Sequence, residues 1–278
     1  MANLNINYFS PCLQYNTNLK IFIPTPSVEE IAKQKTNYFK IGVNFPVLYL
    51  LHDLYEDASD WQNYTNIMQY AQENHIIVVM PSVGNSFYQD MYKGANYLTF
   101  ITEELPAYIQ KYFPASHDKS ETYIGGVNIG GYGAMHIALH QPNRFGYAFS
   151  ILGSLDICNI NYKELINCPI NVDDIFENYD DISNTKINLR NQITSLNSKK
   201  LNNEIKFFLS CSENDISYNT NLEYLNLLKN NNFSVTFDKG KENSKWAYCD
   251  KALGKALKWI KLDHDDLNNM GLNHYGKN

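Results

Sequence analysis

The chain has 278 residues, a formal net charge of −6 and 44% hydrophobic residues, so it suits one large folded domain or two small ones. Nucleic-acid binding is excluded, because phosphate binding needs a basic face and this acidic sequence has none. A membrane-spanning helix is excluded as well, because no run of about 18 apolar residues occurs.

Strand and helix patterns alternate along the chain and predict a mainly parallel sheet covered on both faces. The first two strands are expected to pair as a hairpin or meander. A polar region at about 154–203 interrupts the alternation, and Pro106 is expected to bend one helix. The expected strands are 5–9, 18–24, 45–53, 76–81, 121–127, 144–153, 205–215 and 233–240, and the expected helices are 59–75, 96–113, 131–142, 220–231 and 246–261.

The two ends of the chain and its cysteines indicate where the protein works. The first residues lack the charged start, apolar block and cleavage site of a signal peptide, and residues 263–278 form a polar stretch expected to be a loose tail. An odd number of scattered cysteines indicates reduced thiols and no metal site. We therefore predict a cytoplasmic protein. The cysteines are Cys12, Cys158, Cys168, Cys211 and Cys249.

The segment 123–135, YIGGVNIGGYGAM, carries the strongest functional signal. It predicts a strand, a cramped glycine turn and the start of a helix, which is the setting of the G-x-S-x-G nucleophile turn of serine esterases. In the frame from Gly126 to Gly130 the central residue is Asn128 instead of serine. Asn128 is then either an ordinary turn residue or the remnant of a nucleophile position, lost naturally or by engineering.

Seven further segments and Thr17 carry a resemblance to a known family. They are YFSPCL, LYLLHDL, DWQNYTNI, IIVVMPSVGNSFYQDM, LTFITEELPAYIQKYFP, GGYGA and CSENDISY, between about residues 7 and 262. In these segments the chain resembles the esterase D group of α/β-hydrolases, particularly the bacterial tributyrin esterases, a group that includes S-formylglutathione hydrolase and the mycolyltransferases. The resemblance implies a single α/β-hydrolase domain over residues 1–262, in which 154–203 is a cap-like insertion.

The resemblance also implies a catalytic triad, and its three positions can be located. The nucleophile position is Asn128, whose amide nitrogen is not nucleophilic at neutral pH. The acid position is Asp215, which by itself is more typical of a turn or helix cap. The histidine position is Ser244, two residues before Trp246, and a serine hydroxyl is no base at neutral pH. All three positions are predicted to be vestigial.

The oxyanion hole of such a family is built from two backbone N–H groups, here those of Leu54 and Ile129. The resemblance implies that His52 supports this loop and is not the base. Asp53 stands where relatives usually have glycine, and its carboxylate would oppose a developing negative charge if it points inward. Together with Trp246 these residues are expected to line a ligand cleft.

Other histidines and thiols offer alternatives to the missing triad. His136 and His140 have the i, i+4 spacing of two metal ligands, but we expect exposed helix residues there because no zincin pattern follows. Cys211 and Cys249 lack a histidine partner and are expected to be inert, with Lys245 the only obvious cation near them.

Two main hypotheses follow. The first is a pseudo-esterase that binds a small acyl-ester or carbohydrate-like ligand, or a protein partner, without hydrolysis. The alternative is a working carboxylesterase for small acyl esters with unrecognised machinery or an engineered active site. A metal-dependent hydrolase using His136 and His140 is a third. No cofactor is implied, and the sequence leaves homo-oligomerisation open.

Overall fold

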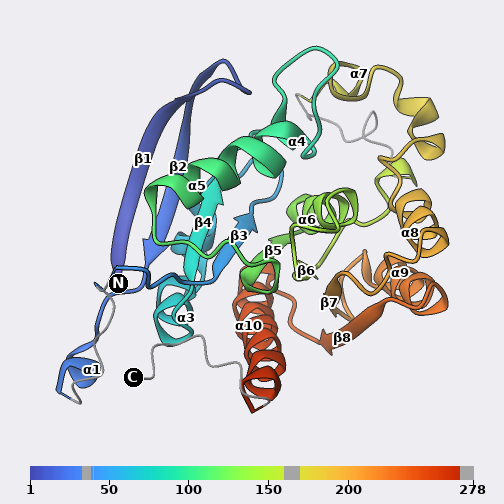
Figure 1. The fold of residues 1–278 in the computed structure, drawn as a ribbon. Helices are drawn as coiled ribbons and strands as arrows, with labels where there is room; N and C mark the ends of the chain where they lie inside the picture. The colour runs from blue at the N-terminus through green and yellow to red at the C-terminus, as the bar shows by residue number, and fades with distance from the viewer. Residues whose placement is uncertain (33–38, 40, 160–169, 270–278) are drawn as a thin grey trace.

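A mixed eight-stranded sheet forms the centre of the molecule (Figure 1). The computed structural model describes residues 1–32, 39, 41–159 and 170–269, and for 261–269 only the backbone. Strand order is β1-β2-β4-β3-β5-β6-β7-β8, which confirms the predicted α/β fold. The strands are β1 (Ala2–Ser10), β2 (Tyr15–Ile23), β3 (Val47–Leu51), β4 (Ile77–Pro81), β5 (Thr122–Val127), β6 (Tyr147–Ile151), β7 (Lys206–Ser212) and β8 (Ser234–Gly240).

The burial of the strands follows their sequence patterns. β3, β4 and β5 are buried at every residue, because helices cover both faces of the sheet there. β1 instead alternates between partly buried and exposed residues. It pairs antiparallel with β2 from Ala2↔Ile23 to Ser10↔Tyr15, so the predicted hairpin is confirmed. From β4 to β8 all neighbouring strands are parallel.

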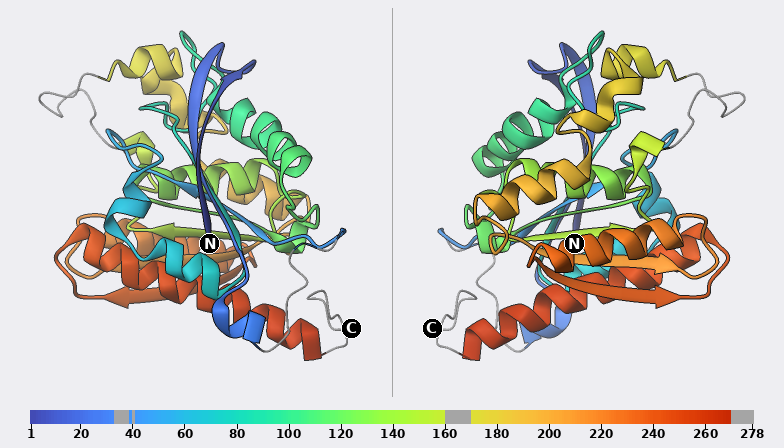
Figure 2. Two further views of the ribbon diagram at one scale, coloured as in Figure 1. Left: turned by 90° about the vertical axis from the view of Figure 1, so that its left-hand side faces the viewer. Right: turned by 90° about the vertical axis from the view of Figure 1, so that its right-hand side faces the viewer.

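Helices cover the sheet on both faces (Figure 2). α5, α6 and α9 pack on one face and α2, α3 and α10 on the other. The α-helices are α1 (Val28–Ala32), α2 (Asp60–Tyr64), α3 (Ile67–Glu73), α4 (Tyr97–Thr99), α5 (Leu105–Tyr112), α6 (Ile129–His140), α7 (Val172–Phe176), α8 (Leu189–Ser198), α9 (Tyr218–Asn230) and α10 (Lys245–Asn269). Short 3₁₀ or π segments are η1 (Phe100–Glu104), η2 (Lys119–Glu121), η3 (Ile157–Asn159) and η4 (Tyr179–Asn184).

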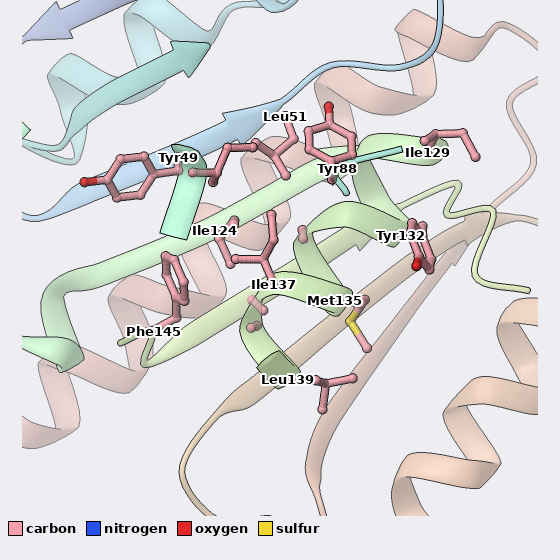
Figure 3. Packing of buried hydrophobic residues seen from close by; sticks show 14 of the residues in the cluster. Tyr49, Leu51, Tyr88, Ile124, Ile129, Tyr132, Met135, Ile137, Leu139 and Phe145 are labelled. Carbon is pink, nitrogen blue, oxygen red and sulfur yellow. The ribbon is translucent and has the colours of Figure 1, made fainter. Parts of the chain in front are cut away.

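The core beneath α6 holds the site in place (Figure 3). Ile137 of α6 is fully buried beside Ile124 of β5, Met135 is fully buried on another side of the helix, and the rings of Tyr49 and Phe145 meet edge to face with centroids 6.2 Å apart. Every residue of α6 except the last, His140, is buried, and its side chains are apolar apart from Tyr132, His136 and His140. A helix that is buried on all sides is expected to be mostly apolar.

Several predicted boundaries differ from the structure. The predicted helix 59–75 is two helices, because the chain turns extended at Thr65 between α2 and α3. The predicted helix 96–113 contains the π-helical segment η1, and Pro106 lies in the first turn of α5, where it has no N–H to pair. The tail was predicted to begin at 263, but α10 continues to Asn269. Residues 270–278 lie outside the described part.

The polar region at about 154–203 is more ordered than its sequence pattern indicates. Its described residues form η3, α7, η4 and α8, while residues 160–169 lie outside the described part. The loop before α4 meets α7, where Tyr92 and Lys93 N–H groups donate to backbone carbonyls at 3.1 and 2.8 Å. Across the helices that the structure describes, none has the length and apolar character needed to cross a membrane.

Candidate active site

The turn between β5 and α6 has the backbone of a nucleophile elbow. Asn128 lies at its tip with φ 49° and ψ −112°, a conformation that few non-glycine residues adopt. A Cβ on Gly126 would lie 2.2 Å from the carbonyl oxygen of Gly130, and a Cβ on Gly130 would lie 2.5 Å from the carbonyl oxygens of Leu51 and His52. Both flanking glycines are therefore required by close backbone contacts, whatever residue stands at the tip. We call residues 126–130 the elbow.

The carboxylate of Asp53 points into this elbow. Its Oδ1 accepts a hydrogen bond from the backbone N–H of Ile129 at 3.2 Å, and its Oδ2 accepts one from Nδ2 of Asn128 at 2.7 Å. Ile129 is the first residue of α6, so the carboxylate also lies at the positive end of that helix. One of the two backbone donors predicted for the oxyanion hole is thus bonded to an internal anion.

Lys245 and Glu56 complete the charge network around Asp53. Lys245 Nζ lies 2.9 Å from Asp53 Oδ2 and 2.6 Å from Glu56 Oε1, and Glu56 Oε2 accepts from the backbone N–H of Asp53 at 3.2 Å. The three side chains are 32%, 14% and 16% exposed for Lys245, Asp53 and Glu56. Two carboxylates therefore share one ammonium group in a partly buried position.

This arrangement keeps Lys245 charged. Burial acts to lower the pKa of Lys245, but the Asp53 and Glu56 carboxylates outweigh it and the pKa is raised. Burial raises the pKa of Glu56, and the Lys245 ammonium offsets only part of this shift. At neutral pH Lys245 is a cation with no free lone pair, so it is neither a base nor a nucleophile.

His52 is held as a neutral ring by two backbone groups. Its Nε2 accepts from the N–H of Val83 at 3.1 Å, so Nδ1 carries the proton and donates to the carbonyl of Asp53 at 2.6 Å. Burial lowers the pKa of His52. The hydroxyl of Tyr88 donates to the His52 carbonyl at 2.5 Å. Both ring nitrogens are in use, so His52 positions the loop that carries Asp53 and has no atom left to act as a base.

The start of α10 places Lys245, and not the predicted Ser244, toward the elbow. Ser244 is exposed immediately before the helix, and its carbonyl accepts the N–H of Tyr248 at 3.0 Å. The Trp246 ring stacks on Tyr64 with centroids 5.1 Å apart and meets Trp61 edge to face at 5.4 Å, and Lys245 Nζ lies 5.2 Å from its centroid. The side chain one residue after the predicted histidine position therefore reaches the site.

Comparison with known proteins decides the family. The family model Esterase matches residues 34–252. The chain belongs to the Esterase family. An acetyl esterase of Caldicellulosiruptor saccharolyticus is 24% identical over 266 residues, covering 94% of this chain and 98% of that enzyme. The diacylglycerol acyltransferase/mycolyltransferase Ag85A of Mycobacterium leprae is 33% identical over 156 residues, but that match covers 52% of this chain and 46% of that protein.

Solved structures agree with this assignment. FphF, a fluorophosphonate-binding serine hydrolase of Staphylococcus aureus, is similar with a TM-score of 0.83 and 25% sequence identity, covering 93% of this chain and 98% of that one. The S-formylglutathione hydrolase FrmB of the same organism has a TM-score of 0.76 at 25% identity, with coverages of 93% and 98%. The predicted resemblance and the α/β-hydrolase fold are confirmed.

Asp215, at the predicted acid position of this Esterase-family chain, forms hydrogen bonds in the turn that precedes α9. Asp215 Oδ1 accepts from the N–H of Ser217 at 2.8 Å and from its hydroxyl at 2.6 Å, just before α9. The Asp215 N–H donates to the carbonyl of Ser212 at 3.0 Å. These bonds are those of a turn that begins a helix. The Asp53 carboxylate accepts hydrogen bonds from Asn128, Ile129 and Lys245, whereas the hydrogen bonds described for Asp215 join it only to residues 212–218.

The two cysteines near the site are inert thiols by their surroundings. Cys211 and Cys249 are fully buried. Burial raises the pKa of Cys211 to about 11, and burial raises the pKa of Cys249 although Lys245 acts in the opposite direction. Both remain protonated at neutral pH, where a thiol is a poor nucleophile.

The prediction that His136 is exposed is wrong. Its side chain is buried because α8 packs against α6: Nδ1 lies 3.1 Å from Oε1 of Gln192, and the ring stacks on Tyr132 with centroids 5.6 Å apart. Burial lowers the pKa of His136 to about 4. His140 is exposed as predicted. Among the residues that the structure describes, no group of three or more His, Cys, Asp or Glu side chains forms a metal site.

The sequence analysis did not identify Glu56 as part of the charge network. It also did not predict that the side chain of Lys245 points toward the elbow. Lys245 was noted only as a cation near Cys249. The sequence did contain one indication of this network, the unusual Asp53 beside His52. A buried carboxylate needs a partner, and a lysine, Lys245, directly follows the predicted histidine position Ser244. A pairing across 192 residues cannot be inferred from spacing alone.

Proposed function

We propose that this Esterase-family protein is a non-hydrolytic member that uses the hydrolase scaffold for binding. One observation carries the proposal: Asp53 Oδ1 accepts the backbone N–H of Ile129 at 3.2 Å. This is the donor that would stabilise the oxyanion in a hydrolytic relative. The absence of serine at Asn128 and of histidine at Ser244 supports the same conclusion.

The charge on Asp53 opposes ester hydrolysis more strongly than a missing donor does. Acyl transfer builds negative charge on the carbonyl oxygen, and removal of one oxyanion donor from a serine protease costs about 10²–10³ in turnover. A carboxylate held at that donor would in addition repel the negative charge that develops on the carbonyl oxygen of the ester. Loss of the nucleophile or its base costs about 10⁶, and such losses do not add. These magnitudes leave no useful esterase activity.

Turnover of p-nitrophenyl acetate and butyrate tests the proposal. We expect the unmodified protein to match a boiled control, and Asn128→Ser alone to stay inactive because the elbow still faces Asp53 and lacks a base. Asn128→Ser with Lys245→His and Asp53→Gly should regain measurable turnover, because the side chain at position 245 is the one at the start of α10 that reaches the elbow. Asp53→Gly alone serves as the matched control and should remain inactive.

The alternative, a carboxylesterase for small acyl esters, draws support from the acetyl esterase relative. It predicts turnover by the unmodified protein well above the boiled control. It also predicts a covalent adduct with a fluorophosphonate probe, detected by mass spectrometry of the intact chain. Either result would overturn the non-hydrolytic function.

The ligand class we propose is a small acyl ester or a carbohydrate-like molecule, as the scaffold of the family suggests. Thermal shift with a panel of such molecules measures binding without turnover. A ligand at a hundred times its dissociation constant stabilises the folded state by about 2.7 kcal/mol, which is well above the detection limit of the method. A panel without a hit, in a protein that also binds no partner, would contradict a binding role.

A further inference from the structure

Three hydrogen-bond donors at the elbow are already paired within the chain. The Ile129 N–H donates to Asp53 Oδ1 at 3.2 Å, and Nδ2 of Asn128 donates to Asp53 Oδ2 at 2.7 Å. Lys245 Nζ is shared by the carboxylates of Asp53 and Glu56 at 2.9 and 2.6 Å. A ligand oxygen that needs one of these donors would have to take it from a mostly buried carboxylate, which is costly.

The tip of the elbow presents an acceptor instead. A carboxylate has no hydrogen to donate, so the amide of Asn128 turns its nitrogen toward Asp53. The amide oxygen, Oδ1, then lies on the other side of the group. In the part of the chain that the structure describes no donor is bonded to this oxygen, and Asn128 is partly exposed. The position that holds the nucleophile in serine esterases therefore offers a ligand a hydrogen-bond acceptor.

The loop beside the elbow is negatively charged. Residues 53–60 contain no lysine or arginine but four carboxylates, those of Asp53, Glu56, Asp57 and Asp60. The hydrogen bond from Ser59 lowers the pKa of Asp57, so this carboxylate stays ionised at neutral pH. Lys245 provides one positive charge for the two carboxylates that it contacts. A cation is therefore favoured over an anion at this edge of the sheet.

The side chain of Lys245 shows which kind of cation these surroundings suit. Its alkylammonium group contacts two carboxylates and lies 5.2 Å from the centroid of the Trp246 ring. A cation at this distance is attracted by the face of an aromatic ring. Tyr64 stacks on Trp246 and is 54% exposed, so the aromatic wall continues to the surface.

We propose that the elbow binds its ligand through an alkylammonium group, which donates to Asn128 Oδ1 and balances the charge of Asp53 and Glu56. An ester carbonyl has no hydrogen to donate to this oxygen, and a carboxylate would meet like charge. The inference rests on the proposed binding function and narrows its ligand to one that carries an ammonium group. Free amines and lysine side chains of other proteins share this chemistry.

Ligand-observed NMR titration of the full chain tests the charge and the donor. Butylammonium, butanol and butyrate have similar alkyl chains but differ in charge and hydrogen bonding. We expect butylammonium to bind about tenfold more tightly than butanol, because charge-assisted hydrogen bonds are about twice as strong as neutral ones. Butyrate should show no saturable binding. Butylammonium that binds no better than butanol, or less tightly than butyrate, would overturn the proposal.

Two variants test the acceptors. Asn128→Gly removes Oδ1 at a positive φ that glycine adopts without strain, and Glu56→Gln removes one charge. Each should weaken butylammonium binding about tenfold. Glu204→Gln is the matched control, because Glu204 also pairs with a lysine, Lys119, but precedes β7 at the opposite edge of the sheet. Its effect should be negligible, and equal weakening by the control would overturn the site.

Lys245→Met tests the same carboxylates in the opposite direction. Without the internal ammonium group, Asp53 and Glu56 have no cation, so butylammonium should bind at least about tenfold more tightly. Unchanged or weaker binding would overturn the proposal. Circular dichroism shows whether each variant is folded, and the probe series on the unmodified protein decides the matter if none of them is.

A blocked tripeptide with a central lysine distinguishes the two sources of the group. Tighter binding of the peptide than of butylammonium supports a lysine of a partner protein, and equal or weaker saturable binding supports a free amine. Turnover of p-nitrophenyl acetate by the same preparation separates this inference from the proposed function. Turnover would overturn the non-hydrolytic role, whereas a protein with neither turnover nor a preference for ammonium would overturn this inference alone.

Discussion

The elbow and the start of α10 both belong to the site, but they differ in how closely their backbones are packed and in which side chains they present. The elbow keeps the strained backbone of a nucleophile turn although Asn128 cannot attack an ester. The start of α10 is helical, but the side chain that it directs toward the elbow is Lys245. The resemblance places a histidine at the neighbouring position, Ser244. The elbow is packed backbone against backbone, whereas Ser244 is exposed. Close packing holds the backbone of the elbow whatever residue stands at its tip, whereas an exposed position such as Ser244 can change without disturbing the fold.

The largest effect is expected from Gly126→Ala in the elbow. The added Cβ would lie 2.2 Å from the carbonyl oxygen of Gly130, a backbone atom that cannot move aside. We expect a loss of about 3 kcal/mol in the free energy of unfolding. Urea unfolding followed by circular dichroism measures it. Ser244→Ala at the exposed position is the control and should change stability by less than about 0.5 kcal/mol. Similar values for the two variants would remove the contrast between the regions.

A smaller change in the free energy of unfolding is expected when the pH is lowered, because His136 of α6 is buried as a neutral ring. Burial lowers its pKa to about 4, while an unfolded chain has a histidine pKa of about 6.5. Below pH 6.5 the unfolded chain binds a proton that the folded protein does not, so stability present above pH 6.5 is lost as pH falls toward 4. Between pH 7 and pH 5 this amounts to about 2 kcal/mol.

Urea unfolding at both pH values measures that slope, and His136→Gln is the comparison. The variant should lose less stability between pH 7 and pH 5 than the unmodified protein, since all other titrating groups are shared. An identical slope in the two proteins would contradict the assignment of this pH dependence to the buried ring of His136.

The smallest effect is expected from Lys245→Met at the start of α10. The substitution leaves Asp53 and Glu56 facing each other without a cation, but Lys245 is 32% exposed and water screens the remaining charges. We expect a loss of about 1 kcal/mol at pH 7. The loss should shrink as pH falls, because the raised pKa of Glu56 makes it take up a proton early.

Lys239→Met is the matched control for this variant. Lys239 also pairs with a glutamate, Glu213, but at an exposed position, so its loss should have a smaller effect than that of Lys245. Urea unfolding at pH 7 and pH 4.5 compares the two variants. A larger loss of stability for Lys239→Met than for Lys245→Met would contradict the expectation that the less exposed network around Asp53 contributes more to the folded state.

Much of the fold could be predicted from the residues. The hairpin, the buried strands and the elbow follow from patterns within short segments, because β-pairing and glycine turns depend on local spacing. The helix breaks at Thr65 and in η1 were missed, since both depend on packing beyond the segment. His136 was misplaced for the same reason: its burial depends on α8, which begins about 50 residues later in the chain.

By itself the sequence determined that serine and histidine are absent at Asn128 and Ser244, and that an uncommon acid, Asp53, follows His52. Only the tertiary structure decided where that acid points. Its bonds to Ile129 and Lys245 span 76 and 192 residues. A carboxylate out of water must find donors wherever the fold brings them, and local spacing carries no information about which distant donors those are.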